Sequence, residues 1–338
     1  MTTTTSKLET AVQGSWQRFL ETYEPLRSPL YRYCRYLTRS PWDAEDLAQD
    51  ALARAFVTLG RMHGQAPENP RAWLFRIASN LWIDETRRHR ELPAAVDIAE
   101  PAAPAAEPRA PREAAGTLLV TLSPQERAAV LLKDVFDFSL DEIAESLGTT
   151  TGAVKTALHR GRGKLAEEPA AVASVTTTAP VPGALDAFCA AFNAGDIDRL
   201  TALLLDNAVV EVVGATTQYG PEAARRTVLF GMLFGFKRLT DPSVRAFFDA
   251  RFADAPLPEE PPRVEARLHR GRWLLLHWHR HADGDAVRAI TTLEIDGDRV
   301  ARLENYFYNP DFLTDLGGEL DVPVRVNGHR WWIPEVQS

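Results

Sequence analysis

The stretch that decides the fold reads Ser139-Leu-Asp-Glu-Ile-Ala-Glu-Ser-Leu-Gly-Thr-Thr-Thr-Gly-Ala-Val-Lys-Thr-Ala-Leu-His-Arg-Gly-Arg-Gly-Lys164. Ser139 followed by Glu142 is a capping box, in which the two side chains satisfy backbone N–H groups at the start of a helix. Gly148 ends this short helix, and after Thr149–Gly152 a basic helix begins. Two helices joined by a glycine-containing turn predict a helix-turn-helix, which places its second helix in the major groove of DNA.

The basic helix has an apolar inner face at Val154, Leu158, Gly161 and Leu165, so its polar side chains are expected outside. The candidate DNA contacts of this segment are Thr150, Thr151, Lys155, Thr156, His159, Arg160, Arg162 and Lys164. Lys155 and Arg160 have donors suited to guanine edges, whereas Arg162 and Lys164 suit phosphates. The alternative interpretation is an ordinary basic helix face exposed to solvent, but the turn and the capping residues before this helix favour DNA contact.

The total charge of −8 hides a local pattern. Residues 1–168 carry 21 Lys and Arg against 23 Asp and Glu, a balance of −2, so residues 169–338 have the remaining −6. Within the first part, Lys155–Lys164 has four cations and no acid, and Arg71–Arg90 has five cations against two acids. Local basic stripes are the electrostatic sign of nucleic-acid contact, whatever the total charge.

Two breaks in composition divide the chain. In Pro93–Pro111, 13 of 19 residues are Pro or Ala, which indicates a semi-extended linker, and Glu168–Pro182 is rich in Ala, Val, Thr and Pro. Another helix is expected to begin after Ser123, because this serine can cap it, a proline follows at the first helical position and Glu126 completes a capping box. The expected organisation is a helical domain at 12–92, a linker at 93–113, the helix-turn-helix domain at 114–168, a linker at 169–181 and a third domain at 182–338.

The first domain is expected to be all-helical. Asp43–Val57 has apolar residues at helical spacing behind a cluster of acids, and Arg71–Arg88 has Leu74, Ile77, Ala78 and Leu81 on one face. The third domain starts with two short helices, Ala184–Phe192 and Ile197–Leu205. It continues with runs of strand-forming residues separated by Arg-Gly, Asp-Gly and Asp-Gly-Asp turns. These runs predict an α+β domain with a curved antiparallel sheet.

With these residues in view, the first two domains resemble the sigma-70 family of RNA polymerase sigma factors, in its extracytoplasmic-function group. Asp43-Ala-Glu-Asp-Leu-Ala-Gln-Asp50 is similar to the family's polymerase-clamp helix, and Pro70–Asp84 followed by Arg87-Arg88 is similar to its promoter-melting, minus-ten helix. Leu122–Arg127 through His159-Arg-Gly-Arg162 is similar to the minus-thirty-five reader. The three motifs occur in the family's order over about 150 residues.

The resemblance implies a protein that binds core RNA polymerase and promoter DNA. It implies minus-ten DNA contacts at Arg71, Trp73, Arg76, Asn80, Arg87 and Arg88. An aromatic ring such as Trp73 can stack on an unpaired base, although tryptophans in helices also fill cores; for Trp82 the core is the favoured role. The resemblance implies polymerase contacts at Asp43, Glu45, Asp46, Gln49 and Asp50. The alternative for these acids is a favourable helix N-terminus.

The third domain resembles the SnoaL-like branch of the NTF2-like superfamily. The likeness lies in Phe188-Cys-Ala-Ala-Phe-Asn-Ala-Gly-Asp-Ile-Asp-Arg-Leu200 followed by a strand, and it implies a domain that modulates sigma activity from within the chain. Asn309-Pro310-Asp311 is similar to a motif in the tail of one such sigma group, which makes these residues a candidate regulatory tail.

His277, His279 and His281 alternate on one expected strand, so they share a sheet face with Trp273. Over about 13 Å they are too far apart to ligate one ion together, and no metal site or catalytic residue is predicted. Trp273, His277 and His279 are a candidate ligand pocket, with ordinary packing the favoured alternative.

No cofactor and no membrane span are expected, and the two distant cysteines fit the cytoplasm. Two other classes stay open: a conventional helix-turn-helix regulator without polymerase binding, and a bifunctional protein whose third domain binds a ligand or acts as a hydrolase or isomerase.

Overall fold

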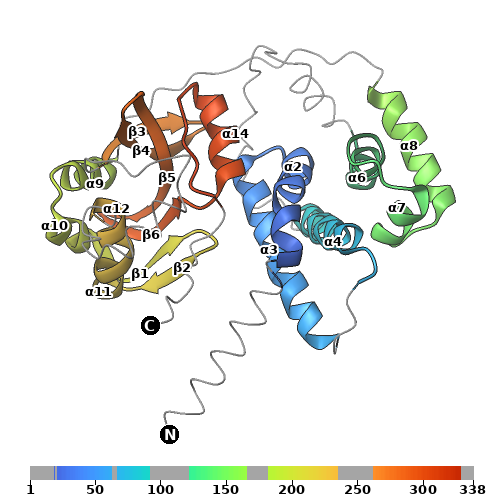
Figure 1. The fold of residues 1–338 in the computed structure, drawn as a ribbon, viewed down its shortest axis with the longest axis horizontal. Coiled ribbons are helices and arrows are strands. Elements are labelled where there is room, and N and C mark those ends of the chain that lie inside the picture. Colours follow the sequence, from blue (N-terminus) through green and yellow to red (C-terminus); the bar gives the residue numbers. More distant parts are fainter. Residues whose placement is uncertain are drawn as a thin grey trace, which may run out of the picture. The chain divides into compact units, whose positions relative to one another are not determined.

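The computed structural model describes residues 19, 21–62, 67–91, 122–165, 182–234 and 262–328 (Figure 1). The chain divides into two compact units, Met1–Ser174 and Val175–Ser338, and the boundary falls inside the second expected linker. Both expected linkers, 93–113 and 169–181, lie outside the described residues, as do 12–18, 114–121 and 329–338.

The first helices of unit 1 form around an aromatic centre. They are η1 (Glu24–Leu26), α2 (Arg27–Thr38), α3 (Pro41–Arg61) and α4 (Pro70–Glu91). Ser40 caps α3 by accepting a hydrogen bond from the N–H of Asp43 at 3.3 Å, so α3 begins at the proline two residues before the predicted start. Tyr33 of α2 stacks on Phe75 of α4, and its hydroxyl lies 2.7 Å from Ser79 Oγ. This buried pair holds α2 against α4.

The helix-turn-helix is confirmed in unit 1. Its elements are α6 (Pro124–Val130), the π-helical turn η3 (Leu131–Val135), α7 (Leu140–Ser146) and α8 (Thr151–Leu165). Both predicted capping boxes are present, at Ser123 with Glu126 and at Ser139 with Glu142. Gly148, at φ 60°, has the left-handed backbone that ends α7.

Unit 2 consists of helices and one mixed sheet. Its helical elements are α9 (Gly183–Asn193), α10 (Ile197–Ala202), α11 (Pro221–Ala224), η4 (Arg225–Leu229), α12 (Phe230–Phe234) and α14 (Pro310–Leu320). Its strands are β1 (Leu204–Val212), β2 (Thr216–Tyr219), β3 (Arg263–His269), β4 (Arg272–His281), β5 (Gly284–Asp296) and β6 (Arg299–Tyr306). Within the described residues the six strands lie in the order β2-β1-β6-β5-β4-β3.

The expected α+β class is confirmed, with one difference in the sheet. The strand pairs are antiparallel except β1 with β6, which run parallel from Leu204 opposite Val300 to Val212 opposite Asn305. The chain between these two strands adds four other strands before it returns, and a parallel partner of this kind requires a long connection. The residue pattern along one strand does not predict which distant strand it pairs with.

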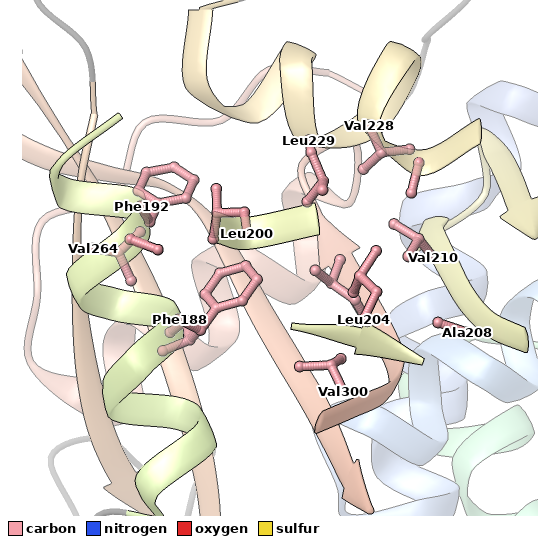
Figure 2. Close-up of a cluster of buried hydrophobic side chains, with 14 of the residues drawn as sticks. Phe188, Phe192, Leu200, Leu204, Ala208, Val210, Val228, Leu229, Val264 and Val300 are labelled. Atoms are coloured by element: carbon pink, nitrogen blue, oxygen red, sulfur yellow. The ribbon is translucent and has the colours of Figure 1, made fainter. Parts of the chain in front are cut away.

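The two faces of the sheet are covered by different helices. Figure 2 shows the hydrophobic cluster on one face, where Phe188 and Phe192 of α9 lie with Leu204, Val264 and Val300. On the other face α14 packs through Phe312, whose ring stacks on Tyr306 at 4.3 Å between centroids. Tyr306 is opposite Ile290 in the register, one residue along from the Thr291 row that belongs to the α9 face.

The chain after α14 returns to the sheet beside β5. Val287 donates its N–H to Pro323 O at 2.8 Å and accepts from the N–H of Arg325 at 2.9 Å, so residues 323–325 pair with β5 beyond the end of β6. A Cβ added to Gly317 of α14 would lie 2.2 Å from Cγ2 of Val324. Gly317 therefore allows the close approach of this returning segment to α14.

Replacing Gly317 by alanine is expected to lower the free energy of unfolding of unit 2 by up to about 2 kcal/mol. Overpacking of this kind costs about 1–3 kcal/mol, which exceeds the helix-propensity gain of about 1 kcal/mol. Gly318, the next residue of α14, has no atom within 4 Å of its added Cβ, so Gly318→Ala is the matched control and is expected to stabilise by up to about 1 kcal/mol. Chemical denaturation measures both variants, and shifts of the same sign would contradict the packing role of Gly317.

Candidate nucleic-acid interface

The α8 helix separates its buried and exposed residues as the sequence predicts. Val154, Leu158 and Gly161 are buried, and a Cβ added to Gly161 would lie 2.8 Å from Val130 Cγ2, so α8 packs closely on α6. The exposed candidate contacts are Thr150, Lys155, Thr156, His159, Arg160 and Arg162. An exposed, cation-bearing helix behind a tight turn is the arrangement that a major groove can accept.

The threonines at the start of α8 serve the helix itself. Thr150 Oγ1 accepts a hydrogen bond from the N–H of Ala153 at 3.2 Å, and Thr156 donates to Gly152 O at 3.0 Å. A capping hydroxyl still has its hydrogen, so Thr150 can donate to a phosphate while it caps α8. Thr151 is half-buried at the first position of α8.

Arg162 and Lys164 are paired with acids of their own domain. Arg162 donates to both carboxylate oxygens of Asp134, with Nε 3.0 Å from Oδ2, and Lys164 Nζ lies 2.7 Å from Glu126 Oε2. Burial raises the pKa of Glu126, but hydrogen bonds from Lys164 and Ser123 outweigh it and lower that pKa overall. These two cations therefore hold α8 against α6 and η3, in addition to the phosphate role that the sequence predicts.

The candidate minus-ten residues on α4 fall into two groups. Asn80 and Arg87 are exposed, and Arg88 is exposed beside Glu85, 2.8 Å away on the same helix. Trp73 is half-buried, with its ring 6.0 Å from that of Tyr23, whereas Trp82 is buried, in the core role favoured from the sequence.

Arg71 and Arg76 form the second group, because they contact the helix-turn-helix. Arg71 donates to Phe136 O at 2.8 Å with its guanidinium 4.8 Å from the centre of the Phe138 ring, and Arg76 pairs with Glu145 at 2.9 Å. The acceptor Glu145 carries no sequence signal for this contact, since an exposed acid on a helix is ordinary.

The acidic face of α3 is only partly exposed. Asp43, Asp46 and Asp50 are exposed and Gln49 is half-buried, but Glu45 is 2% exposed. Its carboxylate accepts from Arg27 at 2.6 Å and from Gln49 at 3.0 Å. Glu45 therefore holds α2 against α3, a contact that the periodicity of α3 does not reveal.

Comparison with known proteins places these helices in one family. Residues 22–91 match the family described as Sigma-70 region 2, and residues 112–165 match Sigma-70, region 4. The RNA polymerase sigma-E factor of Streptomyces coelicolor is 34% identical over 160 residues, 46% of this chain and 88% of that protein. This chain belongs to the family of ECF RNA polymerase sigma factors.

Two further matches cover a larger share of this chain. The ECF RNA polymerase sigma factor SigG of Mycobacterium tuberculosis is 32% identical over 229 residues, 58% of this chain, and the match spans 61% of the length of SigG. The crystal structure of the Mycobacterium tuberculosis extracytoplasmic function sigma factor SigJ matches 87% of this chain and 98% of that one, with 22% identity and a TM-score of 0.30.

The candidate ligand-pocket residues lie in or against the core of unit 2. Trp273 packs against the hydrophobic cluster on the α9 face. His277 is buried against Phe192, with its Nε2 2.7 Å from Thr291 Oγ1, and Asn305 donates to the same oxygen at 2.9 Å. His279 is 5% exposed, and burial together with the nearby Arg288 lowers its pKa to about 2. Burial alone lowers the pKa of His277 to about 3.

Arg288 is the residue of this region that the sequence does not single out. It occupies a β-bulge, since Ala289 is opposite His277 while Val287 is opposite Trp278, and its side chain is fully buried. Its Nε donates to Asn327 Oδ1 at 2.8 Å, and Asn327 donates to Arg288 O and Phe307 O. Burial and the nearby Arg325 lower the pKa of Arg288 to about 10. The pair anchors the returning segment of the chain on β5.

The Asn-Pro-Asp motif lies at the start of α14. Asn309 is buried at the N-cap position, Pro310 is the first helical residue, and Asp311 is in the first turn, where the helix dipole favours an acid. Across the described ranges, no group of three His, Cys, Asp or Glu side chains is placed to hold a metal ion. No helix in the described part of the chain is long and apolar enough to cross a bilayer.

Proposed function

We propose that this chain binds core RNA polymerase in the cytoplasm and directs it to promoter DNA for transcription initiation. The observation that carries the proposal is the exposed cationic face of α8, with Lys155 and Arg160 outside and Val154 and Leu158 buried behind it. Membership of the ECF family supports the polymerase step, because region 2 supplies the α3 and α4 helices. In this proposal α8 reads the minus-thirty-five element and α4 the minus-ten element.

The polymerase contact is proposed on the exposed acids of α3. Asp43, Asp46 and Asp50 lie outside, and Gln49 lies beside them, whereas the buried Glu45 supports the helix from within. This division separates residues that a partner can reach from one that it cannot. Charged side chains of this kind favour orientation and rate of association more than affinity.

The C-terminal unit is proposed to modulate sigma activity. Its support is that an α+β unit is fused to the sigma regions in one chain, with the Asn309-Pro310-Asp311 motif at the start of α14. We propose no catalytic reaction for it, because the buried His277 is hydrogen-bonded to Thr291 and Trp273 packs against the core cluster. The polymerase would supply the phosphoryl chemistry, and the chain would need no cofactor.

The test is run-off transcription with core polymerase on a pool of genomic promoters, with the full-length chain and a version that ends at residue 168. Promoter-specific transcripts with the full-length chain are expected, and the chain itself should co-purify stoichiometrically with core polymerase. DNA binding without transcripts or polymerase binding would contradict the proposal and favour a conventional helix-turn-helix regulator. Identical activity and promoter choice of the two versions would contradict modulation by the C-terminal unit.

A further inference from the structure

Two histidines of β4 have buried ring nitrogens that no group in the described part of the chain bonds. These atoms are Nδ1 of His279, a residue that is 5% exposed, and Nε2 of His281. His277 differs from them, because its Nε2 lies 2.7 Å from Thr291 Oγ1. Buried polar atoms without a partner are costly and rare, so two of them on one strand point to a molecule that binds there.

The side chain of Arg288 lies on the same face of the sheet as these histidines. His279 is opposite Ala286 and His281 is opposite Gly284 in the pairing of β4 with β5. Residues two apart on a strand share a face, so Arg288, two residues beyond Ala286, joins the face of His279. Because Gly284 and Ala286 are small, β5 places no large side chain directly opposite either imidazole. We call His279, His281 and Arg288 the β4–β5 basic cluster.

Arg288 gives this cluster a buried positive charge. Its side chain is fully buried, and its Nε donates to the neutral amide oxygen Oδ1 of Asn327 at 2.8 Å. Burial lowers the pKa of both His279 and His281, and the nearby Arg288 lowers both further, joined by Arg325 at His281. The two imidazoles therefore lie in a positive potential, which favours an anion beside them.

The acids near the cluster belong to its exposed end. Asp283 pairs with Arg325, and Asp285 pairs with Arg280 at 3.4 Å. Both acids raise the pKa of His281, but by less than burial and the two nearest arginines lower it. The acids of the β4–β5 turn therefore do not cancel the positive potential.

A carboxylate is the anion that fits these groups. A guanidinium and a neutral imidazole both present N–H donors, and carboxylate oxygens accept from either. Next to the cluster the wall is apolar, since the ring of Phe192 meets that of His277 edge-on at 5.0 Å. A dianion such as phosphate costs more to remove from water than a monoanion, so this wall favours a monocarboxylate with a short hydrocarbon chain.

We propose that unit 2 binds a small monocarboxylate at the β4–β5 basic cluster, with the carboxylate between His279 and Arg288 and the hydrocarbon part toward Phe192. His281 is half-buried at the end of β4, so the cluster reaches the surface there. Binding at this site needs no polymerase and no DNA. Loss of the proposed sigma activity would therefore leave the carboxylate site standing, and the reverse also holds.

Binding is tested by titrating the full-length chain with sodium butyrate at neutral pH and constant ionic strength, while NMR follows the isotope-labelled histidine rings. Butyrate is expected to shift the ring signals of His279 and His281 with a millimolar Kd, and to leave those of the exposed His159 unchanged. Butyramide has nearly the same shape without the charge and should bind at least about tenfold more weakly. Equal affinity for the two compounds, or no shift with butyrate, would overturn the proposal.

Sodium phosphate separates a carboxylate site from a general anion site. It is expected to bind more weakly than butyrate, because the apolar wall penalises a dianion. Phosphate that shifts the same histidine signals at equal or lower concentration would overturn the assignment to a carboxylate.

Substitutions then assign the binding to the cluster. His279→Leu removes one donor to the charged oxygens and is expected to weaken butyrate binding about tenfold. Arg288→Gln removes the charge and should weaken it further. Since Arg288→Gln also alters the contact with Asn327, His279→Leu decides the outcome if Arg288→Gln does not fold. Arg280→Met removes an exposed cation of the same strand and is the matched control, for which an unchanged Kd is expected.

Thermal unfolding gives a second readout of the same site. A ligand that binds only the folded state raises the Tm by mass action, so butyrate should raise the Tm of unit 2 in the original chain and in Arg280→Met. The increase should be lost in His279→Leu, whatever the Tm of that variant without butyrate. An equal increase in His279→Leu would place the binding elsewhere and overturn the proposed site.

Discussion

Replacing Lys155 and Arg160 together by alanine is expected to lower transcription from a target promoter by about 30-fold or more. Both side chains are exposed on α8, so their removal leaves the buried face at Val154 and Leu158 intact. One bidentate contact to a guanine is worth about 1–3 kcal/mol, and loss of two such contacts gives a fold-change of this order or greater. The measurement is single-round run-off transcription with the reconstituted polymerase.

The control for this double variant is Arg226→Ala. Arg226 is an exposed cation of unit 2 that pairs with Glu222 within its helix, so its removal changes net charge without touching α8. Arg226→Ala should leave transcription unchanged. Equal losses from both variants would mean that overall charge, and not the α8 surface, sets promoter affinity, which would contradict the proposed reading by α8.

A dependence on salt separates the two kinds of DNA contact. Loss of a phosphate contact weakens binding on every sequence and reduces the salt slope by about one per cation, whereas loss of a base contact relaxes specificity at one position. Lys155→Ala and Arg160→Ala, each measured on the target promoter and on point variants of its minus-thirty-five element, should therefore lose discrimination at particular bases. A uniform loss would assign both residues to the phosphate backbone.

The helix-turn-helix could be predicted in detail because its signals are local. Ser123 with Glu126 and Ser139 with Glu142 are three residues apart, so the capping boxes can be recognised within a single turn of helix. Gly148, whose positive φ ends α7, could likewise be recognised from the residues next to it. Once the start of a helix is known, the 3.6-residue period predicts which of its residues face the core and which face solvent.

Contacts between distant segments could not be predicted in this way. Glu142 bonds Asn69 across 73 residues, and nothing in the sequence near either one marks the other. Glu45 has the same chemistry as Asp43 and Asp46, but it is buried because Arg27 lies on the adjacent helix. A charged residue on a periodic face is read as exposed until its tertiary partner is known.

In unit 2, strand β4 also has some features that could be predicted from the sequence and others that could not. Alternation correctly placed Trp273 and His277 on the face with the core cluster. The bulge at Arg288 inserts one residue into β5, and a single-strand pattern gives no sign of it. The sequence therefore predicted the direction of His277 but not the buried arginine that lowers the pKa of His279.

Acidification from pH 7 to pH 5 is expected to lower the free energy of unfolding of unit 2 by about 4 kcal/mol. Burial lowers the pKa of His277 to about 3 and, with Arg288 and the neighbouring histidines, that of His279 to about 2. In the unfolded chain both titrate near pH 6.5, so below that pH the unfolded state binds more protons and becomes favoured. Each histidine contributes about 1.4 kcal/mol per pH unit between 6.5 and its folded pKa.

The histidines are distinguished by substitution in the full-length chain. His279→Leu removes one titrating group, and it breaks no hydrogen bond at Nδ1 because that atom has no partner within the described residues. The substitution should roughly halve the loss of unfolding free energy on acidification, to about 2 kcal/mol. His277→Gln keeps a group that can bond Thr291 and should give a similar reduction. Denaturant titrations at pH 7, 6 and 5 measure the slope, and Gln substitution of the exposed His159 is the control.

The direction of the pH effect shows whether the histidines of this strand are neutral or protonated in the folded state. A histidine that holds a proton in the folded state would give stability at low pH and lose it as the pH rises. Buried neutral histidines give the opposite sign, because burial penalises the cation at both positions and Arg288 adds to this at His279. If the double variant His277→Gln with His279→Leu unfolds with the same pH slope as the original chain, the acid sensitivity arises elsewhere and neither histidine is held neutral by the fold.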